Sequence, residues 1–226
     1  MIVTIDGPSA SGKTSVAREL AQRLEFALLR TGAMYRALAL AAHRHHWVSR
    51  HAEAELLAQL SHWHIDADET HVYLNGEDVS KEIEGQAMSQ LSSLWAEVRE
   101  VREHITGFIR QRAISYLAEG RSFIAEGRDQ GSYVFPEAQC KFYIDADVTI
   151  RAARRLHDLQ QRGENSLTIS DMVKQLNLRD NRDRARHFAP LCVPQGAVYI
   201  DSSHLNKAQV VQKLLDVIRQ AQERAA

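Results

Sequence analysis

The residues best suited to chemistry lie near the start of the chain, at positions 7–14. They match the pattern GxxxxGK[ST] at every fixed position, Gly7, Gly12, Lys13 and Thr14. Glycines let backbone N–H groups close around phosphate oxygens, and a following helix N-terminus adds a positive dipole end. Lys13 can reach the β- and γ-phosphates, while the Thr14 hydroxyl can bind Mg²⁺. The pattern predicts a binding site for the phosphates of a nucleoside triphosphate, ATP if the protein is a kinase, formed by Gly7, Pro8, Ser9, Ala10, Ser11, Gly12, Lys13, Thr14 and Ser15.

Secondary-structure elements must hold this loop in place. The β-branched run at 2–5 predicts a buried strand directly before it, and the apolar spacing over 13–24 predicts a helix directly after it. Further strands are predicted at 26–29, 123–125, 141–144 and 197–200, and helices at about 33–46, 98–119 and 207–222. This alternation predicts an α/β fold with a five-stranded parallel sheet flanked by helices.

Two segments depart from the alternation. Short strands at 64–66 and 72–74, followed by the hairpin dipeptide Asn75-Gly76, predict a small β insert at about 63–96. The segment 151–186 is helical in tendency and carries nine Lys/Arg against five Asp/Glu. The single domain then consists of a core (1–62, 97–150 and 187–226), this insert and an arginine-rich segment.

Composition excludes several classes of protein. The chain has 226 residues, 25% charged residues and a net charge of -1, so no overall field attracts nucleic acid or anionic membranes. It contains two cysteines, Cys140 and Cys192, in no metal-finger pattern, and no apolar run approaches the ~20 residues of a membrane helix. No targeting segment or unused apolar stripe is visible. We therefore expect a cytoplasmic monomer that binds neither nucleic acid polymers nor membranes.

Three kinds of protein could use such a phosphate-binding loop. A GTPase would need a guanine-binding NKxD motif, but Asn206-Lys207-Ala208-Gln209 lacks the final aspartate. A motor or assembly ATPase has little room for its additional modules in a chain of this length. A small-molecule kinase fits the length best.

The chain also resembles bacterial cytidylate kinases, which are P-loop nucleoside monophosphate kinases. The motifs that carry the resemblance are residues 5–13, Thr31-Gly32-Ala33-Met34-Tyr35-Arg36, Glu126-Gly127-Arg128-Asp129 and Arg179-Asp180-Asn181-Arg182-Asp183, extended by residues 76–80 and 133–137. They span essentially the whole chain in order. The resemblance implies transfer of the γ-phosphoryl group of ATP to CMP or dCMP, with residues 63–96 forming the NMP-binding insert and 151–186 a lid.

The family resemblance also implies roles for individual residues. An acceptor phosphate should meet arginines from several parts of the chain, because guanidinium groups match phosphate geometry. Lys13, Arg128 and Arg186 would be catalytic, and Arg154 and Arg155 of the lid would reach over ATP. The implied CMP-binding residues are Thr31, Arg36, Ser93, Arg102, Arg128, Asp129, Arg179, Asp183 and Arg186.

Some alternatives stay open. Mg²⁺ would be bound by Thr14, with Asp6 or Glu126 acting through water and Asp145 as a rival. Arg30 and Gln130 depart from the family pattern, which puts the acceptor preference in question. The acceptor could instead be UMP, AMP or a small metabolite, and a non-catalytic ATP-binding protein is a further alternative.

Overall fold

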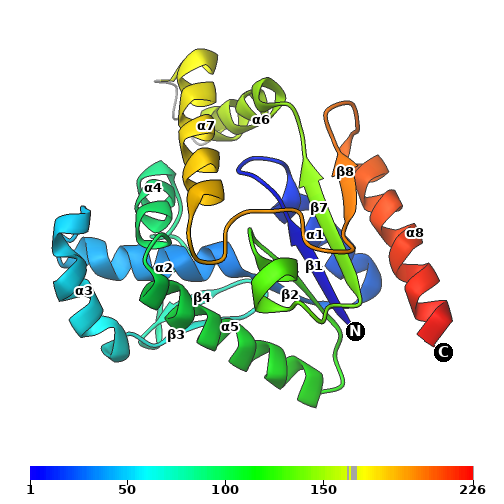
Figure 1. Ribbon diagram of the computed structural model, residues 1–226, viewed down its shortest axis with the longest axis horizontal. Coiled ribbons are helices and arrows are strands. Elements are labelled where there is room, and N and C mark those ends of the chain that lie inside the picture. The colour runs from blue at the N-terminus through cyan, green and yellow to red at the C-terminus, as the bar shows by residue number, and fades with distance from the viewer. Residues whose placement is uncertain (162, 164–166, 226) are drawn as a thin grey trace. The chain divides into compact units, whose positions relative to one another are not determined.

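Strands and helices alternate from the first residues of the chain (Figure 1). The computed structural model describes residues 1–161, 163 and 167–225. The central sheet has five strands in the order β2-β6-β1-β7-β8. Its strands are β1 (Ile2–Asp6), β2 (Ala27–Arg30), β6 (Phe123–Glu126), β7 (Cys140–Asp145) and β8 (Val198–Asp201). The predicted five-stranded parallel sheet is confirmed, and each strand begins and ends within one residue of its predicted bounds.

The chain forms two compact units. The first consists of Met1–Phe26 and Ile124–Ala226, and the second of Ala27–Phe123. In the first unit, β1 pairs in parallel with β7 from Val3 opposite Cys140 to Asp6 opposite Tyr143. This register brings the end of β1, where the phosphate loop (Gly7–Thr14) begins, beside the end of β7.

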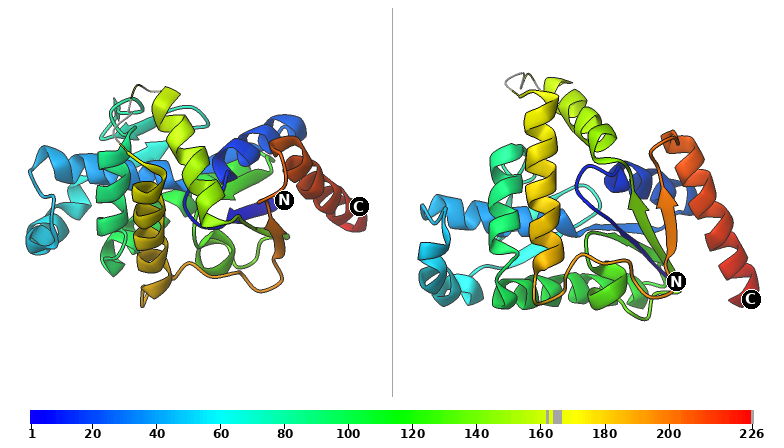
Figure 2. Two further views of the ribbon diagram at one scale, coloured as in Figure 1. Left: turned by 90° about the horizontal axis from the view of Figure 1, so that it is seen from above. Right: turned by 45° about the horizontal axis from the view of Figure 1, so that its top comes forward.

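Helices of the first unit pack through apolar faces. α1 (Lys13–Leu24) buries Val16 and Leu20 and contacts α8 (Lys207–Ala225), which also packs on β7. Figure 2 shows α8 running beside β8. α1 is capped at its C-terminus by Glu25, which adopts a left-handed conformation and donates its N–H to the Ala21 carbonyl.

The arginine-rich segment forms two helices that lie side by side in Figures 1 and 2. They are α6 (Val148–Gln161) and α7 (Ile169–Ala185). Their contact is an apolar seam of Ala152, Leu159, Met172 and Leu176. Thr168 and Asp171 form a capping box that begins α7. Residues 162 and 164–166 of the predicted lid lie outside the described residues.

The second unit contains a small antiparallel sheet and several helices. Its strands pair in the order β3-β4-β5, and Asn75 and Gly76 both have positive φ angles, as the predicted two-residue hairpin turn requires. The predicted insert, 63–96, lies inside this unit. The elements of the second unit besides β2 are α2 (Thr31–Arg44), η1 (Arg50–Ala52), α3 (Glu53–Gln59), η2 (Leu60–His62), β3 (Ile65–Ala67), β4 (Val72–Leu74), β5 (Glu77–Asp78), α4 (Gln86–Trp95) and α5 (Arg99–Ala118).

Helix α4 was not anticipated from the sequence. Its three serines have modest helix propensity. The helix forms because Met88, Leu91 and Trp95, at helical spacing, bury one face, and α4 packs against α2. Across the described part of the chain, no helix combines the length and apolar character needed to cross a membrane.

Candidate functional site

The phosphate loop owes its shape to two glycines. A Cβ at Gly7 would lie 2.0 Å from the Ile144 carbonyl oxygen, so no larger residue fits between the loop and β7. Gly12, with φ of 89°, caps the N-terminus of α1 in a conformation that L side chains rarely adopt. Lys13 and Thr14 therefore occupy the first turn of α1, where the sequence placed them.

Lys13 is buried within the loop that precedes it. Its Nζ donates to the Pro8 carbonyl at 2.6 Å and to Ser11 Oγ at 3.2 Å. Burial lowers the pKa of Lys13 well below its ordinary value, and the nearby Arg128 guanidinium lowers it further. The carboxylates of Glu126, Asp180 and Asp6 oppose this shift. The loop therefore surrounds the Lys13 ammonium, which is the position expected of a group that binds phosphate oxygens.

The candidate metal-binding carboxylates have different partners. Thr14 Oγ1 donates to Glu126 Oε1 at 3.1 Å, so a hydroxyl and a carboxylate lie together at the start of α1. Asp6 instead accepts the N–H groups of Gln130 and Gly131 at 2.8 and 2.7 Å. Burial raises the pKa of Asp6 to about 7, although these hydrogen bonds oppose the shift. Both Asp6 oxygens are therefore already used in holding a turn.

That turn positions Asp129, one of the predicted CMP-binding residues. Asp129 is buried at the start of the single π-helical turn Gln130–Val134. Gln130 is fully buried, and its Nε2 donates to Asp129 Oδ1 at 3.1 Å. Gln130, which departs from the family pattern, thus fixes the orientation of the Asp129 side chain.

Asp183 is the centre of the arginine cluster of the first unit. Arg128 Nε lies 3.1 Å from Asp183 Oδ2, and Arg186 binds Asp183 Oδ1 from one turn along the chain. Burial raises the pKa of Asp183, but the guanidinium groups outweigh it and hold the pKa below its ordinary value, Arg186 first, then Arg128 and Arg179. The structure therefore brings three of the predicted CMP-binding arginines near the carboxylate of a fourth predicted residue, Asp183.

The predicted lid arginines lie on α6. Arg154 donates to Ser202 Oγ at 3.2 Å and to the Ser202 carbonyl at 2.8 Å, on the loop that follows β8. Arg155 is half-buried on the same helix. Their reach over ATP stays a prediction.

The remaining predicted residues belong to the second unit. Thr31 and Arg36 lie on α2, Ser93 on α4 and Arg102 on α5, and α2 packs against both other helices. Arg102 is buried, with its guanidinium 5.5 Å from the centre of the Tyr35 ring and its Nη1 donating to the Ala96 carbonyl at 3.2 Å. Ser93 Oγ is buried and has no hydrogen-bond partner among the described residues. A buried hydroxyl of this kind is free to form a hydrogen bond with a polar group of a ligand.

Arg30, the other departure from the family pattern, has a partner in the same unit. Its Nη2 donates to the Thr70 carbonyl at 3.0 Å. The side chain therefore supports the segment between β3 and β4.

Sequence reasoning missed one buried pair beside the phosphate loop. Arg151 Nη1 lies 2.6 Å from Asp180 Oδ2, and each of the two residues also binds Ser9. A signal was present, because Asp180 stands in the same motif as Arg179 and Asp183. Its partner, far away in the chain, could not be identified from that motif.

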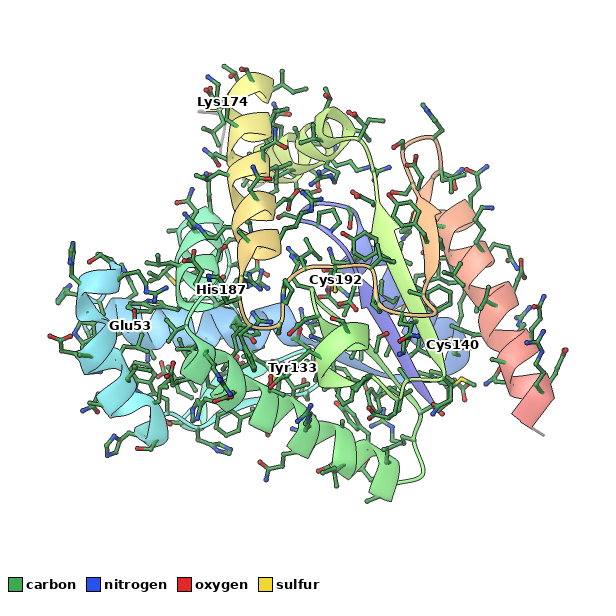
Figure 3. All side chains as sticks on the ribbon, in the orientation of Figure 1. Glu53, Tyr133, Cys140, Lys174, His187 and Cys192 are labelled. Carbon is green, nitrogen blue, oxygen red and sulfur yellow. The ribbon has the colours of Figure 1, made fainter. Side chains whose placement is uncertain are left out.

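Among the side chains that the structure describes there is neither a disulfide nor a cluster of three metal-ligating residues. Both cysteines are free: Cys140 is buried at the start of β7, and Cys192 is exposed on the segment between α7 and β8 (Figure 3). Within the described ranges, no three His, Cys, Asp or Glu side chains form a metal-binding group. A Mg²⁺ ion would be held mainly by phosphate oxygens and water, as is usual for nucleotide sites.

Known proteins match the chain over almost its full length. The sequence profile described as cytidylate kinase matches residues 3–220. A cytidylate kinase of Caldanaerobacter subterraneus subsp. tengcongensis is 37% identical over 217 residues, which cover 96% of this chain and 94% of that protein. A cytidylate kinase of Vibrio vulnificus (strain YJ016) is 40% identical over 221 residues, 96% of this chain and 95% of the relative.

A solved structure shares the chain path. An uncharacterised protein from Eubacterium ventriosum superposes with a TM-score of 0.50 at 14% identity, covering 97% of this chain and 98% of its own. It shows the fold alone. The full-length profile match and the relatives at about 40% identity go further, and with the phosphate loop and the arginine cluster in place they show that the chain belongs to the cytidylate kinase family.

Proposed function

We propose that this protein transfers the γ-phosphoryl group of ATP to CMP and dCMP, giving ADP and the cytidine diphosphate. The observation that carries the proposal is the match to the cytidylate kinase family over residues 3–220, with the phosphate loop complete. A cytoplasmic location and a monomeric state stay predictions of the sequence.

Phosphoryl transfer of this kind depends on position and charge. The acceptor phosphate is itself a nucleophile near neutral pH, so no side chain has to remove a proton from it. Lys13 would bind the β- and γ-phosphates of ATP. Arg128 and Arg186 would neutralise charge on the group in transfer, and Asp183 keeps both guanidinium groups in fixed positions before substrate arrives.

The acceptor would be recognised by its base as well as by its phosphate. Cytosine presents an amino donor and two acceptors along one edge, which suits a carboxylate together with a guanidinium and a hydroxyl. Asp129 is supported as the carboxylate by its hydrogen bond from Gln130. Ser93 and Arg102 are supported by their burial on helices that both pack against α2. The remaining proposed contacts with the nucleotide are those of Thr31, Arg36, Arg179 and Asp183.

Bound Mg²⁺ would neutralise charge on the transferred phosphates. Thr14 and Glu126 fit such an ion, because they place two oxygen ligands 3.1 Å apart beside the phosphate loop. Asp6 fits poorly, since both its oxygens accept backbone N–H groups. We therefore propose Glu126, acting through water, as the carboxylate partner of Thr14.

A coupled ADP-release assay tests the proposal directly. Mg-ATP would be offered with CMP, dCMP, UMP, AMP or GMP, and with no acceptor. We expect strong ADP release with CMP and dCMP only. ADP release with another monophosphate alone would support a kinase and contradict the assignment of cytosine as the base. No ADP release with any acceptor, although ATP still binds, would contradict the proposal that the protein is an enzyme.

A single variant tests the assignment of the base. Asp129→Ala should raise the KM for CMP by about tenfold or more, because a buried group left without its partner discriminates strongly, while the KM for ATP stays within about twofold. Asp216→Ala is a matched control, since Asp216 is an exposed aspartate on α8 of the first unit. Equal losses for both nucleotides in Asp129→Ala would contradict the assignment.

A further inference from the structure

We propose that Asp180, held in place by Arg151, orients the Pro8–Ser9 peptide of the phosphate loop and thereby sets the position of the Lys13 ammonium for ATP. Neither residue belongs to the predicted nucleotide-binding set. This proposal rests on the ATP-dependent activity proposed above and adds a positioning pair to it.

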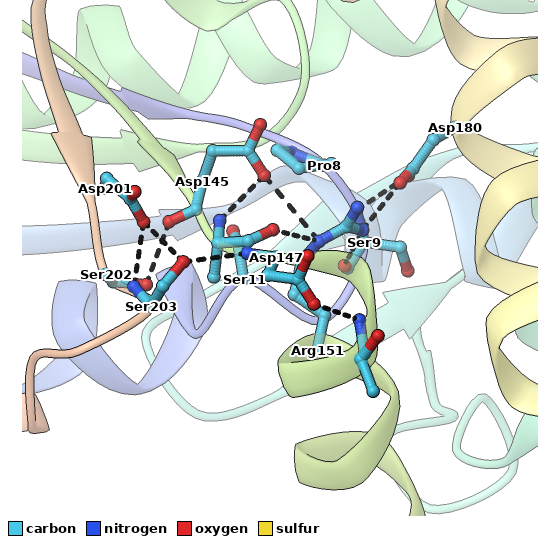
Figure 4. Close-up of polar contacts among 12 residues, drawn as sticks. Pro8, Ser9, Ser11, Asp145, Asp147, Arg151, Asp180, Asp201, Ser202 and Ser203 are labelled. Atoms are coloured by element: carbon cyan, nitrogen blue, oxygen red, sulfur yellow. Dashed lines mark hydrogen bonds and ion pairs between the residues drawn. The ribbon is translucent and has the colours of Figure 1, made fainter. Parts of the chain in front are cut away.

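Asp180 and Arg151 hold both polar groups of one loop residue. Asp180 Oδ1 accepts the Ser9 N–H at 3.0 Å, and Arg151 Nη1 donates to the Ser9 carbonyl at 2.9 Å (Figure 4). The two side chains are joined by the 2.6 Å contact between Arg151 Nη1 and Asp180 Oδ2. Arg151 is further held by its Nε, which donates to the Ala146 carbonyl at 2.9 Å. The network therefore ties the loop to α6, to α7 and to the end of β7.

The same peptide group connects this network to Lys13. In a planar trans peptide the C=O and N–H groups point in opposite directions. The Pro8 carbonyl accepts Lys13 Nζ at 2.6 Å, and the N–H of the same peptide, on Ser9, is directed to Asp180. Rotation of the peptide away from Asp180 would withdraw the Pro8 carbonyl from Lys13. Asp180 thus fixes the orientation of the Pro8 carbonyl, and that carbonyl in turn fixes the position of the Lys13 ammonium.

Stability alone does not account for a buried pair of this kind. The side chains of Arg151 and Asp180 are 5% and 1% exposed. Burying two charges carries a desolvation cost that often cancels their attraction, so an apolar pair of similar volume would serve the core equally well. An apolar pair could not bind the N–H and carbonyl of Ser9. The Ser9 N–H requires an acceptor at position 180, and the buried charge of Arg151 requires that acceptor to be a carboxylate.

An isosteric variant gives the sharpest test. In Asp180→Asn the charged Arg151 retains the side-chain oxygen, so the amide NH₂ group faces the Ser9 N–H and the two donors repel. We expect the KM for Mg-ATP to rise about tenfold, which corresponds to the loss of about one hydrogen bond, while the KM for CMP stays within about twofold. Titration calorimetry with Mg-ATP alone should show the same weakening without turnover.

A second variant distinguishes orientation from general damage. In Arg151→Met/Asp180→Asn the arginine no longer competes, so the amide oxygen can turn to the Ser9 N–H. We expect the affinity for Mg-ATP to return to within about threefold of wild type. The matched control is Arg50→Met/Glu53→Gln, which makes the corresponding changes in the pair between η1 and α3, outside the predicted insert and lid, and should leave both KM values unchanged.

The results for the two variants either support or overturn the proposed role of Asp180. Wild-type Mg-ATP affinity in folded Asp180→Asn, or equal losses for ATP and CMP, would overturn the proposal. If Asp180→Asn does not fold, the double variant decides, and a tenfold loss of Mg-ATP affinity there would also overturn it. Failure of the CMP-kinase proposal would look different: wild-type protein would bind Mg-ATP but release no ADP with CMP.

Discussion

Arginine–carboxylate pairs occur in both compact units, but at different depths. In the first unit, Asp183 and Asp180 are buried and each binds an arginine that touches proposed site residues. In the second unit, Arg44 binds Glu77 and Glu82 at 2.7 and 3.0 Å with all three side chains substantially exposed. The chemistry is the same, yet water screens the second set and leaves the first to act on its neighbours. The burial of an arginine–carboxylate pair, more than its presence, therefore indicates that its charges contribute to the proposed site.

The largest expected effect comes from the buried cation of the phosphate loop. Lys13→Ala should lower kcat for CMP phosphorylation by at least about 10²–10³, because a preorganised charge facing the phosphates would be lost. Circular dichroism and Tm should remain native, since burial already disfavours this charge. Lys207→Ala is the exposed counterpart: Lys207 binds Glu19 at 2.7 Å, and its loss should leave kcat unchanged. Comparable losses of kcat in Lys13→Ala and Lys207→Ala would remove the distinction between the buried and the exposed lysine.

Removing the buried carboxylate of the arginine cluster should damage the fold. Asp183→Ala leaves Arg128 and Arg186 without their shared counterion, and we expect the free energy of unfolding to fall by about 3–5 kcal/mol. Urea denaturation would measure the change. A loss below about 1 kcal/mol would place this cluster in the same class as the exposed pairs.

The pH dependence of stability should follow Asp183. The arginines hold its pKa below the ordinary value of 3.8. Its contribution is therefore fully present above the unfolded pKa and is lost as the pH falls through the lower folded value. Unfolding curves from about pH 6 to 2.5 should show a steep loss below pH 4 in wild type and a shallower one in Asp183→Asn. The same dependence of stability on pH in wild type and Asp183→Asn would show that Asp183 is not the group responsible.

The smallest effect is expected for a pair at the surface of the second unit. Arg112 binds Asp66 at 3.1 and 2.7 Å, with the Asp66 side chain 42% exposed. Asp66→Ala should lower the free energy of unfolding by no more than about 1 kcal/mol, and added salt should reduce the difference further. A loss as large as that in Asp183→Ala would break the comparison between the two units.

The predictable part of the fold was the part with short-range signals. The strand before Gly7, the helix after Gly12 and the Asn75-Gly76 turn all follow from residues within a few positions of each other, and the structure confirms them. Helices α3 and α4 were missed, because their sequences are short and α4 is rich in serine. Tertiary packing against α2, which no local pattern reveals, stabilises α4.

The candidate site divides in the same way. The phosphate loop could be predicted because its residue types stand at close spacing, and the family and the list of arginines followed from short motifs in order along the chain. The long-range partners became known only from the folded chain: Asp183 for Arg128, and Asp180 for Ser9, which lies 171 positions away. A side chain's role depends on which atoms reach it after the chain has folded, and that is set by the order and register of the strands. The same aspartate type therefore binds two arginines at Asp183, two backbone N–H groups at Asp6 and the phosphate loop at Asp180.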